Sequence, residues 1–571
     1  MRALNCGPAT VTLEEGQLRH LRLDGAEAIR GVVFLVRDRD WGTVVPQISD
    51  MRIASDAQGA RVTYRATYDM GTGRLTADIT LTLTADSLTA EALAQATGEV
   101  WTNRAGFTVL HPIEGVAGAP VTLRHADGRT EHARFPGLIA PWQPFQDIAA
   151  LTHRAGGWTV DCAFQGDVFE MEDQRQWGDA SFKTYNRPLA RPWPYHLPEE
   201  ALRQSVQIRW QPATGAAPPV PPLRATHPEP RFPQTALILT APEARRATAH
   251  PQDLTSIGPQ RLLCHLDTSA GTGPQDLAAF AALQAAFPDL DFDLELIAAC
   301  PPDTDLDAEF AGYARAVAAS GLCPASVMVT PAVDRQSVPP GSDWPACPPL
   351  EQIHAAARAA FPGLPLGGGS ASFFPELNRK RPPVQMLDFL THGLCPIVHA
   401  ADDLSVIETL ETVPHILASG RAIAGAAEYR LGPSTIAMRQ NPYGSRTIPN
   451  PDRARICMSD DDPRQEGDFA AAWACGLATA LAPAGLTVWT PAALYGPRGL
   501  FDAGGHPRPV APLVAALAAR AGLPVGQAGI RDGLARLHLG GAVLTANLTS
   551  GPLDAAPDGP LAPFGWRLCD G

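Results

Sequence analysis

Residues 363–403 read GLPLGGGSASFFPELNRKRPPVQMLDFLTHGLCPIVHAADD, and the pattern of this stretch is the starting point for predicting the fold. A short apolar run, LPLGGG, is followed by polar residues, and a second apolar run at 386–400 is followed by two aspartates. The pattern predicts strand, polar loop, strand, polar loop. If both strands are buried and parallel, the polar groups behind them gather at one sheet edge. In a (β/α) barrel this edge is the C-terminal face, where active sites are built.

Six further stretches after residue 234 repeat this alternation. Including the two above, the predicted strands are residues 235–242, 261–267, 293–300, 325–331, 364–369, 386–400, 428–438 and 485–496. Segments with helical spacing separate them, for example 276–287, 306–321, 350–361 and 467–482. Eight β/α alternations in this length predict a (β/α)8 TIM barrel. A doubly wound sheet is disfavoured because no glycine-rich phosphate fingerprint follows the first strand.

The first two hundred residues instead alternate with period two. Val62, Tyr64 and Ala66 fall on one face of a predicted strand while Thr63 and Arg65 fall on the other. Such half-buried antiparallel strands, separated by glycine-containing turns, predict a β-sandwich.

Residues 170–195, EMEDQRQWGDASFKTYNRPLARPWPY, show little periodicity. We expect a long functional loop that folds over the barrel mouth and brings Arg175, Trp177 or Lys183 to the substrate. A structural loop that seals one domain against the next is an equally good interpretation.

Proline-rich sequence ends the N-terminal region, because so many prolines prevent a sheet ladder or a helix interior. Residues 509–522 are predicted to form the closing barrel helix, and a short β segment follows. The predicted domains are 1–215 (β-sandwich), 216–233 (linker), 234–521 (TIM barrel) and 522–571 (small C-terminal β domain).

Composition narrows the possible partners. The formal net charge is −14 and no basic run occurs, which argues against nucleic acid or an anionic membrane as partner. No run of 18 apolar residues and no signal-peptide pattern is found, so we expect a cytoplasmic protein. The pattern leaves the oligomeric state open.

The ten cysteines include no CxxC pair, which makes a disulfide framework or structural zinc unexpected. We also predict that activity needs no metal and no cofactor. His265, Asp267, His399 and Asp402 could ring a divalent ion, but none of them belongs to a tight ligand-spaced motif.

Common catalytic signatures are absent: the chain has no GxSxG, HExxH or GxxxxGK[ST] motif. A sandwich followed by a TIM barrel and a β cap is frequent among glycoside hydrolases, which use two carboxylates. Here neither the fourth nor the seventh predicted strand ends in a glutamate. A glycosidase mechanism is therefore less favoured than the architecture suggests.

Polar side chains follow several predicted strands and form the candidate site. We expect Glu376 or His399 to activate water, Asp402 to orient His399, and Asn378 with Arg379 to polarise a carbonyl. Other strand ends supply further candidate substrate contacts: His265, Asp267, Arg439, Asn441 and Tyr495. Bases beside Arg and Asn donors suit attack of water on an activated ester such as a lactone. Asp402 also suits the N-cap of a helix beginning near Leu404.

Five segments resemble the D-apionate lactonase family: FEMEDQRQWGDASFKTY, GGGSASFFPELNRKRP, PIVHAADDLSVIETL, GPSTIAMRQNPYG and DDPRQEGDFAAAWACG. The resemblance spans nearly the whole chain. It implies an N-terminal domain, a central TIM barrel and a C-terminal domain, and hydrolysis of D-apionolactone to D-apionate. It assigns no catalytic residue.

The leading hypothesis is therefore hydrolysis of a small-molecule sugar lactone. Two alternatives stay open: a retaining glycosidase that uses Glu376 with Glu170 or Glu172, and a carbohydrate-binding protein without catalysis.

Overall fold

The computed structural model describes residues 1–198, 200–215, 223, 227–338, 343–442, 447–554, 556–557 and 559–570. The predicted linker at 216–233 lies outside these residues except for 223 and 227–233. Contacts divide the chain into two compact units. The N-terminal unit comprises Met1–Arg175 and Ala180–Leu223, and the barrel unit comprises Gln176–Asp179, Arg224–Val338 and Asp343–Gly571.

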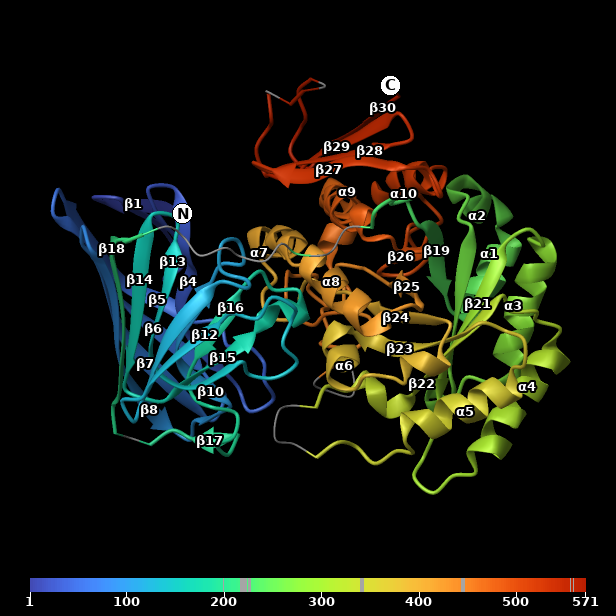
Figure 1. Cartoon of the computed structure of the whole chain (residues 1–571), viewed down its shortest axis with the longest axis horizontal. Coiled ribbons are helices and arrows are strands. Elements are labelled where there is room, and N and C mark those ends of the chain that lie inside the picture. The colour runs from blue at the N-terminus through green and yellow to red at the C-terminus, as the bar shows by residue number, and fades with distance from the viewer. Residues whose placement is uncertain are drawn as a thin grey trace. The chain divides into compact units, whose positions relative to one another are not determined.

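The barrel unit contains a closed barrel of eight parallel strands, which confirms the predicted TIM barrel (Figure 1). One strand lies in each of the eight predicted stretches. They are β19 (Gln234–Leu239), β20 (Arg261–Asp267), β21 (Asp291–Ala298), β22 (Ser326–Pro331), β23 (Leu366–Phe373), β24 (Phe389–Gly393), β25 (Glu428–Leu431) and β26 (Val488–Ala493).

Helices connect the strands, and the alanine-rich segments predicted as helical are helical. The α-helices are α1 (Ala241–Ala249), α2 (Pro251–Ile257), α3 (Pro274–Ala286), α4 (Leu306–Ser320), α5 (Leu350–Ala360), α6 (Phe374–Arg379), α7 (Asp403–Glu408), α8 (Val413–Ala424), α9 (Asp468–Leu481) and α10 (Val510–Ala518). Among the described residues, no helix is both long enough and apolar enough to cross a membrane.

The barrel interior is charged near the N-terminal ends of the strands. Arg261 donates to both carboxylate oxygens of Asp293 at 2.7 Å, and Ser326 donates to the same carboxylate at 2.5 Å. Because side chains alternate along a strand, Leu263 and then His265 follow Arg261 on the same side. This alternation carries His265 to the C-terminal face of the barrel.

The stretch at 363–403 differs from its prediction in one respect. The segment after LPLGGG is not a polar loop: β23 continues to Phe373 and the short helix α6 begins at Phe374. Pro375 in the first turn and a carboxylate oxygen of Glu376 that accepts from the Phe373 backbone N–H, at 3.2 Å, start this helix.

Glycine is required within β23. Gly369 has φ of 121°, and a Cβ there would lie 2.0 Å from the carbonyl oxygen of Thr391 on the neighbouring strand. Any larger side chain would therefore push β23 away from β24.

The two ends of the barrel segment are hydrogen bonded to each other. Phe232, just before β19, donates to Leu523 at 2.9 Å and accepts from Gly522 at 2.8 Å, and Val525 donates to Pro230 at 2.9 Å. These antiparallel contacts place the incoming and outgoing chain side by side beneath the barrel strands.

A small antiparallel sheet follows the outgoing chain, as expected for the C-terminal region. Its strands, in order, are β27 (Val525–Arg531), β28 (Leu534–Leu539), β29 (Ala542–Asn547) and β30 (Trp566–Cys569). Helix α9 packs against all four of them. The sheet therefore belongs to the barrel unit.

The N-terminal unit is built on one large antiparallel sheet. Along its main path the described strands run β1-β2-β3-β4-β10-β16-β15-β13-β14-β18-β8-β7-β6-β5, with β11 and β12 attached beside β13. Their bounds are β1 (Arg2–Cys6), β2 (Ala9–Glu14), β3 (Gln17–Leu23), β4 (Ala26–Arg37), β5 (Gln47–Asp56), β6 (Gly59–Asp69), β7 (Gly73–Leu83), β8 (Ser87–Gly98), β10 (Arg104–His111), β11 (Pro120–His125), β12 (Thr130–Arg134), β13 (Phe145–Ala155), β14 (Trp158–Gln165), β15 (Phe169–Asp173), β16 (Phe182–Tyr185) and β18 (Leu202–Pro212). β9 (Trp101–Thr102) pairs with β17 (Tyr195–His196).

Period-two alternation is confirmed in this unit. Val62, Tyr64 and Ala66 on β6 are buried, and the residues between them are more exposed. The apolar faces of these strands form one continuous core.

The prediction of a long loop at 170–195 is wrong for much of its length. It contains β15, a 3-10 turn at Gln174–Trp177, β16 and β17. Every residue of β15 and β16 is buried, so neither strand shows the alternation that marks a half-exposed strand. Because β15 and β16 contain charged residues, the sequence did not identify them as strands.

Candidate functional site

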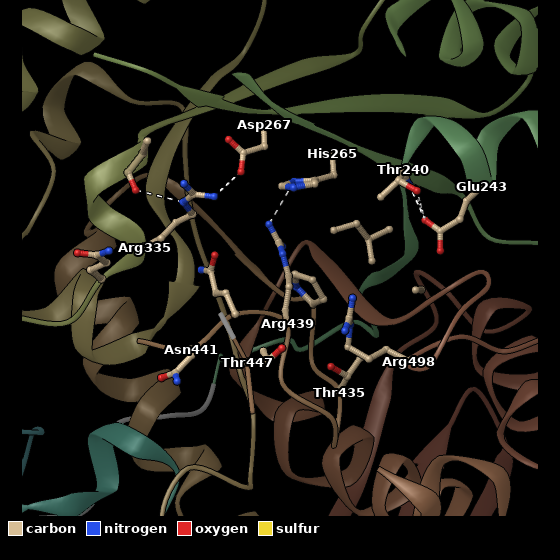
Figure 2. Close-up of a pocket in the computed structure, with 16 residues that line it drawn as sticks. Thr240, Glu243, His265, Asp267, Arg335, Thr435, Arg439, Asn441, Thr447 and Arg498 are labelled. Carbon is tan, nitrogen blue, oxygen red and sulfur yellow. Dashed lines mark hydrogen bonds and ion pairs between the residues drawn. The ribbon is translucent and has the colours of Figure 1, made fainter. Parts of the chain in front are cut away.

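A cavity of about 460 Å³ opens among the C-terminal ends of the barrel strands (Figure 2). Its lining comes from the ends of β19, β20 and β26, from the start of α1, and from the segments that follow β22, β25 and β26. It consists of Ile238, Thr240, Glu243, His265, Asp267, Ala332, Arg335, Gln336, Pro433, Thr435, Arg439, Gln440, Asn441, Thr447, Ala493 and Arg498. This size suits a small ligand, and the lining is rich in hydrogen-bonding groups.

A histidine–carboxylate pair lies at the floor of the cavity. His265 on β20 stands opposite Glu295 on β21, and His265 Nδ1 lies 2.6 Å from a carboxylate oxygen of Glu295. So short a contact with an ionised carboxylate requires the proton on Nδ1, and in the neutral form of the imidazole the lone pair is then on Nε2. Within the described part of the chain no hydrogen bond reaches Nε2, and His265 lines the cavity.

Arg439 completes this group. It donates to both carboxylate oxygens of Glu295, one of them at 3.1 Å, and also lies 3.3 Å from His265 Nδ1. Burial raises the pKa of Glu295, but the charge of Arg439 and the hydrogen bond from His265 outweigh it and lower the pKa to about 2. Glu295 is therefore ionised at neutral pH and fixes both neighbours.

A second ion pair lies beside the first. The carboxylate of Asp267 is paired with Arg335, and Ser269 donates to that carboxylate at 2.6 Å. Asp267 and His265 are two residues apart on one strand, so both side chains face the cavity. Figure 2 shows Arg335 meeting Asp267 on one side of the cavity and Arg439 meeting His265 beside it.

The opposite side of the cavity carries Glu243, Thr240 and Arg498. The backbone N–H and the hydroxyl of Thr240 both donate to one carboxylate oxygen of Glu243, at 2.6 and 2.8 Å. Burial raises the pKa of Glu243 and lowers that of Arg498. The Arg498 guanidinium donates to the carbonyls of Met438 and Asp460, at 3.3 and 3.4 Å, which hold it at the rim.

Of the residues proposed from the sequence, four line this cavity: His265, Asp267, Arg439 and Asn441. Tyr495 does not line it. Its hydroxyl donates to Asp253 at 2.8 Å, behind the end of β26.

A second group of side chains includes residues that follow β23 and β24 along the chain. Arg379 lies 5.4 Å from the ring centre of Trp177, and that ring meets His399 edge-on at 5.7 Å. Nδ1 of His399 lies 2.6 Å from a carboxylate oxygen of Asp179. The structure thus brings Trp177, Arg379 and His399 together within the barrel unit.

Asp402 is the N-cap of α7. Its carboxylate accepts from the backbone N–H of Ser405 at 2.9 Å and from the hydroxyl at 2.6 Å. The cap predicted from the sequence is confirmed. Nδ1 of His399 has Asp179 as a partner, and the orientation of His399 by Asp402 stays a prediction.

Arg175 and Lys183 are buried in the N-terminal unit. Arg175 is paired with Asp173 at 2.7 Å, and Lys183 Nζ lies 2.6 Å from Glu172. Arg175 also donates to the carbonyls of Pro136 and Gly137, at 2.8 and 3.2 Å. Both cations therefore have structural partners inside their own unit.

Glu376 and Asn378 are buried on α6. Asn378 accepts from Arg381 at 3.1 Å. One carboxylate oxygen of Glu376 serves the helix start, and the other has no hydrogen-bond partner among the described residues. Burial raises the pKa of Glu376 to about 7, against a smaller opposing effect of the charge on Arg379.

Replacing this carboxylate should remove a pH-dependent loss of stability. The pKa of Glu376 is about 7 in the folded chain and near 4.5 when unfolded, so between these values the folded state binds more protons. Stability due to this group therefore falls as pH rises from about 4.5 to 7, by about 3 kcal/mol in total, and is constant above. Glu376→Gln should raise the free energy of unfolding at pH 8 and change it little at pH 5.

Urea unfolding at pH 5 and pH 8 tests this expectation. Glu351→Gln, an exposed position on α5, is the matched control and should show no such dependence. Equal changes at both pH values for Glu376→Gln would contradict the expectation.

Sequence reasoning missed four residues of the cavity group: Glu243, Glu295, Arg335 and Arg498. Only Glu295 left a clear signal, because residues 293–297, DLELI, place two acids on one face of an otherwise apolar strand. Glu243, Arg335 and Arg498 come a few residues after strand ends, and the sequence alone does not show that the loops bring them to the cavity.

The four residues considered as ligands of a divalent ion have other partners in the structure. His265 and Asp267 hold Glu295 and Arg335, and His399 holds Asp179. In the described residues, the one group whose His, Cys, Asp or Glu ligand atoms converge lies in the N-terminal unit.

Comparison with known proteins identifies the family. The family description "D-apionate lactonase, N-terminal domain" matches residues 1–213, and "D-apionate lactonase, TIM barrel domain" matches residues 235–522. A D-apionate lactonase of Brucella anthropi is 46% identical over 514 residues, which cover 88% of this chain and 84% of that protein.

Solved structures add little. A putative aldose 1-epimerase of Escherichia coli K12 aligns with a TM-score of 0.26 and 11% identity, over 37% of this chain and 98% of its own. A GH36 α-galactosidase of Geobacillus stearothermophilus aligns with a TM-score of 0.30 and 10% identity, over 95% and 91%. TM-scores this low do not establish a shared fold. The two family matches and the Brucella anthropi relative do establish the family, and the chain belongs to the D-apionate lactonase family.

Proposed function

We propose that this chain hydrolyses the ester bond of a sugar lactone, with D-apionolactone as the leading substrate and D-apionate as its product. The observation that carries the proposal is the His265–Glu295 pair at the floor of the cavity, where no described residue forms a hydrogen bond with Nε2 of the imidazole. Family membership supports the choice of substrate. The small, polar cavity supports a single sugar-sized ligand.

His265 is proposed as the base that activates water. Its Nε2 accepts a proton from water as the water oxygen attacks the lactone carbonyl, and Glu295 stabilises the imidazolium that forms. The C–O bond of the ring then breaks, and the imidazolium returns the proton to the departing alkoxide. The product is the open-chain hydroxy acid, and the enzyme is unchanged.

Arg439 and Arg498 are proposed to stabilise the oxyanion. Both line the cavity, and both are held in place by other groups, Arg439 by Glu295 and Arg498 by backbone carbonyls. A donor that is already oriented stabilises developing charge without reorganisation. Asn441 and the Thr240 and Thr435 hydroxyls are proposed to bind the sugar hydroxyls.

The group at β23 and β24 is the second candidate for water activation. Glu376 has a raised pKa and one carboxylate oxygen with no hydrogen-bond partner in the part of the chain that the structure describes, and His399 is paired with a carboxylate. In this alternative Arg379 and Asn378 polarise the carbonyl, and Trp177 packs against the sugar. The cavity favours His265, because neither Glu376 nor His399 lines it.

A pH-stat assay over a lactone panel tests the proposed activity. D-Apionolactone should consume alkali rapidly, other aldonolactones more slowly, and aryl glycosides should release no phenol. Turnover of aryl glycosides with silent lactones would show a glycosidase instead. Silence on both, with sugar binding detected by calorimetry, would show a binding protein.

Two finer structural proposals accompany this function. The N-terminal unit is proposed to be a β-sandwich, because β1 packs against β6 and β7, and β4 against β13, although these strands are distant along the sheet path. The proposed domain boundaries are 215/216, 233/234 and 521/522. The extents of the two family matches support them.

A further inference from the structure

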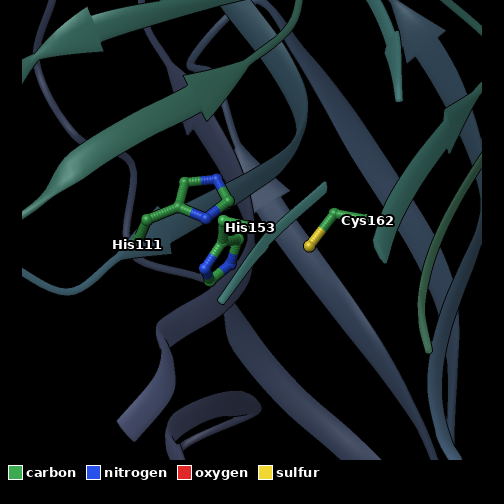
Figure 3. A group of neighbouring side chains, drawn as sticks. All are labelled: His111, His153 and Cys162. Atoms are coloured by element: carbon green, nitrogen blue, oxygen red, sulfur yellow. The ribbon is translucent and has the colours of Figure 1, made fainter. Parts of the chain in front are cut away.

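Three side chains of the N-terminal unit bring metal-ligating atoms together, far along the chain from the cavity residues. They are His111 at the end of β10, His153 on β13 and Cys162 on β14 (Figure 3). One ligand atom from each lies within 4.8 Å of the other two, and all three residues are buried. Two imidazole nitrogens and a sulfur are ligands that soft metal ions prefer.

The sheet itself fixes this arrangement. β13 and β14 pair antiparallel with Leu151 opposite Cys162 and His153 opposite Val160. His153 and Cys162 are therefore diagonal neighbours on one face of the sheet. His111 reaches the same point from β10, and its ring meets the ring of His153 edge-on at 5.4 Å.

Each imidazole uses one nitrogen structurally and leaves the other unsatisfied. Nε2 of His111 bonds the hydroxyl of Thr184 at 3.0 Å, and Nδ1 of His153 bonds the carbonyl of Arg154 at 3.2 Å. The remaining nitrogens, Nδ1 of His111 and Nε2 of His153, are buried and have no hydrogen-bond partner among the described residues. A buried polar atom without a partner costs free energy, so such atoms require an explanation.

The two imidazoles are in the protonation state that a metal ion needs, whereas burial raises the pKa of the Cys162 thiol, so this thiol loses its proton only as the metal binds. Burial lowers the pKa of both imidazoles, that of His153 to about 4, so each is neutral at neutral pH and offers a lone pair. The bond that His153 Nδ1 donates to a carbonyl fixes the tautomer that exposes Nε2. Orientation of a ligand histidine through its other nitrogen is a common feature of metal sites.

We propose that His111, His153 and Cys162 form a buried structural site for one d10 metal ion, Cu⁺ ahead of Zn²⁺. On binding, the thiol of Cys162 loses its proton and the sulfur–metal bond forms, while the imidazoles contribute lone pairs. No oxidation or reduction is involved.

Charge balance favours the monovalent ion. Cu⁺ with one thiolate is neutral, whereas Zn²⁺ with one thiolate leaves a positive charge buried among Phe135 and neighbouring aromatic rings. Structural zinc also takes four ligands, and among the described residues the group offers three. A bound ion would tie β10, β13 and β14 together at one point.

Metal content and thermal stability test the site. Full-length protein, stripped with chelator and kept anaerobic, is given one equivalent of Cu⁺ or Zn²⁺, desalted and measured by mass spectrometry of the metals. Wild type should keep about one equivalent per chain, because a preformed three-ligand site releases its ion slowly. Its melting temperature should rise by about 5–10 °C with free ion 100-fold above the dissociation constant.

Variants separate this site from adventitious binding. Cys162→Ala and His153→Gln should each keep less than about a tenth of an equivalent and lose the thermal shift. Cys6→Ala is the matched control, because Cys6 is another buried cysteine of the same unit outside the group. If wild type retains one of the two ions and both variants lose it, the site is supported and that ion is identified as the one it binds.

No retention by wild type, or equal retention by wild type and Cys162→Ala, would overturn the proposal. X-ray absorption at the metal edge of loaded wild type keeps the test decisive if the variants fail to fold. One sulfur and two nitrogen neighbours are expected, and a shell without sulfur would overturn the site.

Discussion

His265→Asn is expected to lower kcat for lactone hydrolysis by about 10²–10⁴-fold, the usual loss when a general base is removed, with little change in KM. The reason is the geometry at the cavity floor, where Glu295 holds Nδ1 of the imidazole and no residue in the described ranges forms a hydrogen bond with Nε2. Asparagine keeps a polar group near Glu295 but cannot accept a proton from water. The rate is measured in the pH-stat, and folding is checked by thermal melting.

The matched control is His506→Asn, at an exposed histidine outside the cavity that also pairs with a carboxylate, Asp502. It should leave kcat unchanged. Glu376→Gln and His399→Asn complete the series. If His265→Asn keeps a normal kcat and one of those two loses it, water is activated behind β23 and β24 and the assignment to His265 is wrong.

Glu295→Gln is expected to damage both stability and activity. Glutamine leaves the Arg439 guanidinium without its counter-charge inside the barrel, and breaking a buried ion pair in this way costs about 3–5 kcal/mol. It also removes the carboxylate that fixes the tautomer of His265. Loss of that function lowers kcat on the order of 10⁴-fold in enzymes with an orienting carboxylate.

A double variant separates the two effects. Glu295→Gln combined with Arg439→Met removes both charges, so the free energy of unfolding should recover much of its loss while kcat stays low. Urea unfolding and pH-stat rates provide the two measurements. A single variant that unfolds within about 1 kcal/mol of wild type and keeps full kcat would remove Glu295 from the mechanism.

The barrel could be predicted because its signal is repeated. Each of the eight strands is a short apolar run and most intervening helices are alanine-rich. An error in the bounds of one element therefore does not change the predicted number of β/α units. Strand ends were less predictable. Residues 386–400 contain β24 only over Phe389–Gly393, because apolar residues after a strand end can be buried in a loop as well as in a strand.

The N-terminal sheet was predictable where one face meets the core and the other meets water. β15 and β16 were not, because both faces are buried and their charges are neutralised by partners such as Glu172 with Lys183. A sequence shows a charge but not its partner. It therefore indicated a loop where the structure has two central strands.

The candidate site was predicted in part for the same reason. His265, Asp267, Arg439 and Asn441 follow from the rule that catalytic groups lie at the C-terminal ends of barrel strands. Glu295 was missed because it lies one layer deeper, inside β21 and not at its end. The pairing of His265 with Glu295 depends on the register between two strands 30 residues apart.

The hydrogen bonds between residues 230–232 and 522–525 have a consequence for protein engineering. A segment whose first and last residues are neighbours can be cut out, moved or inserted into another protein without stretching a linker. Changes of chain length just before residue 230 can therefore accumulate without altering the distances between His265, Glu295 and Arg439.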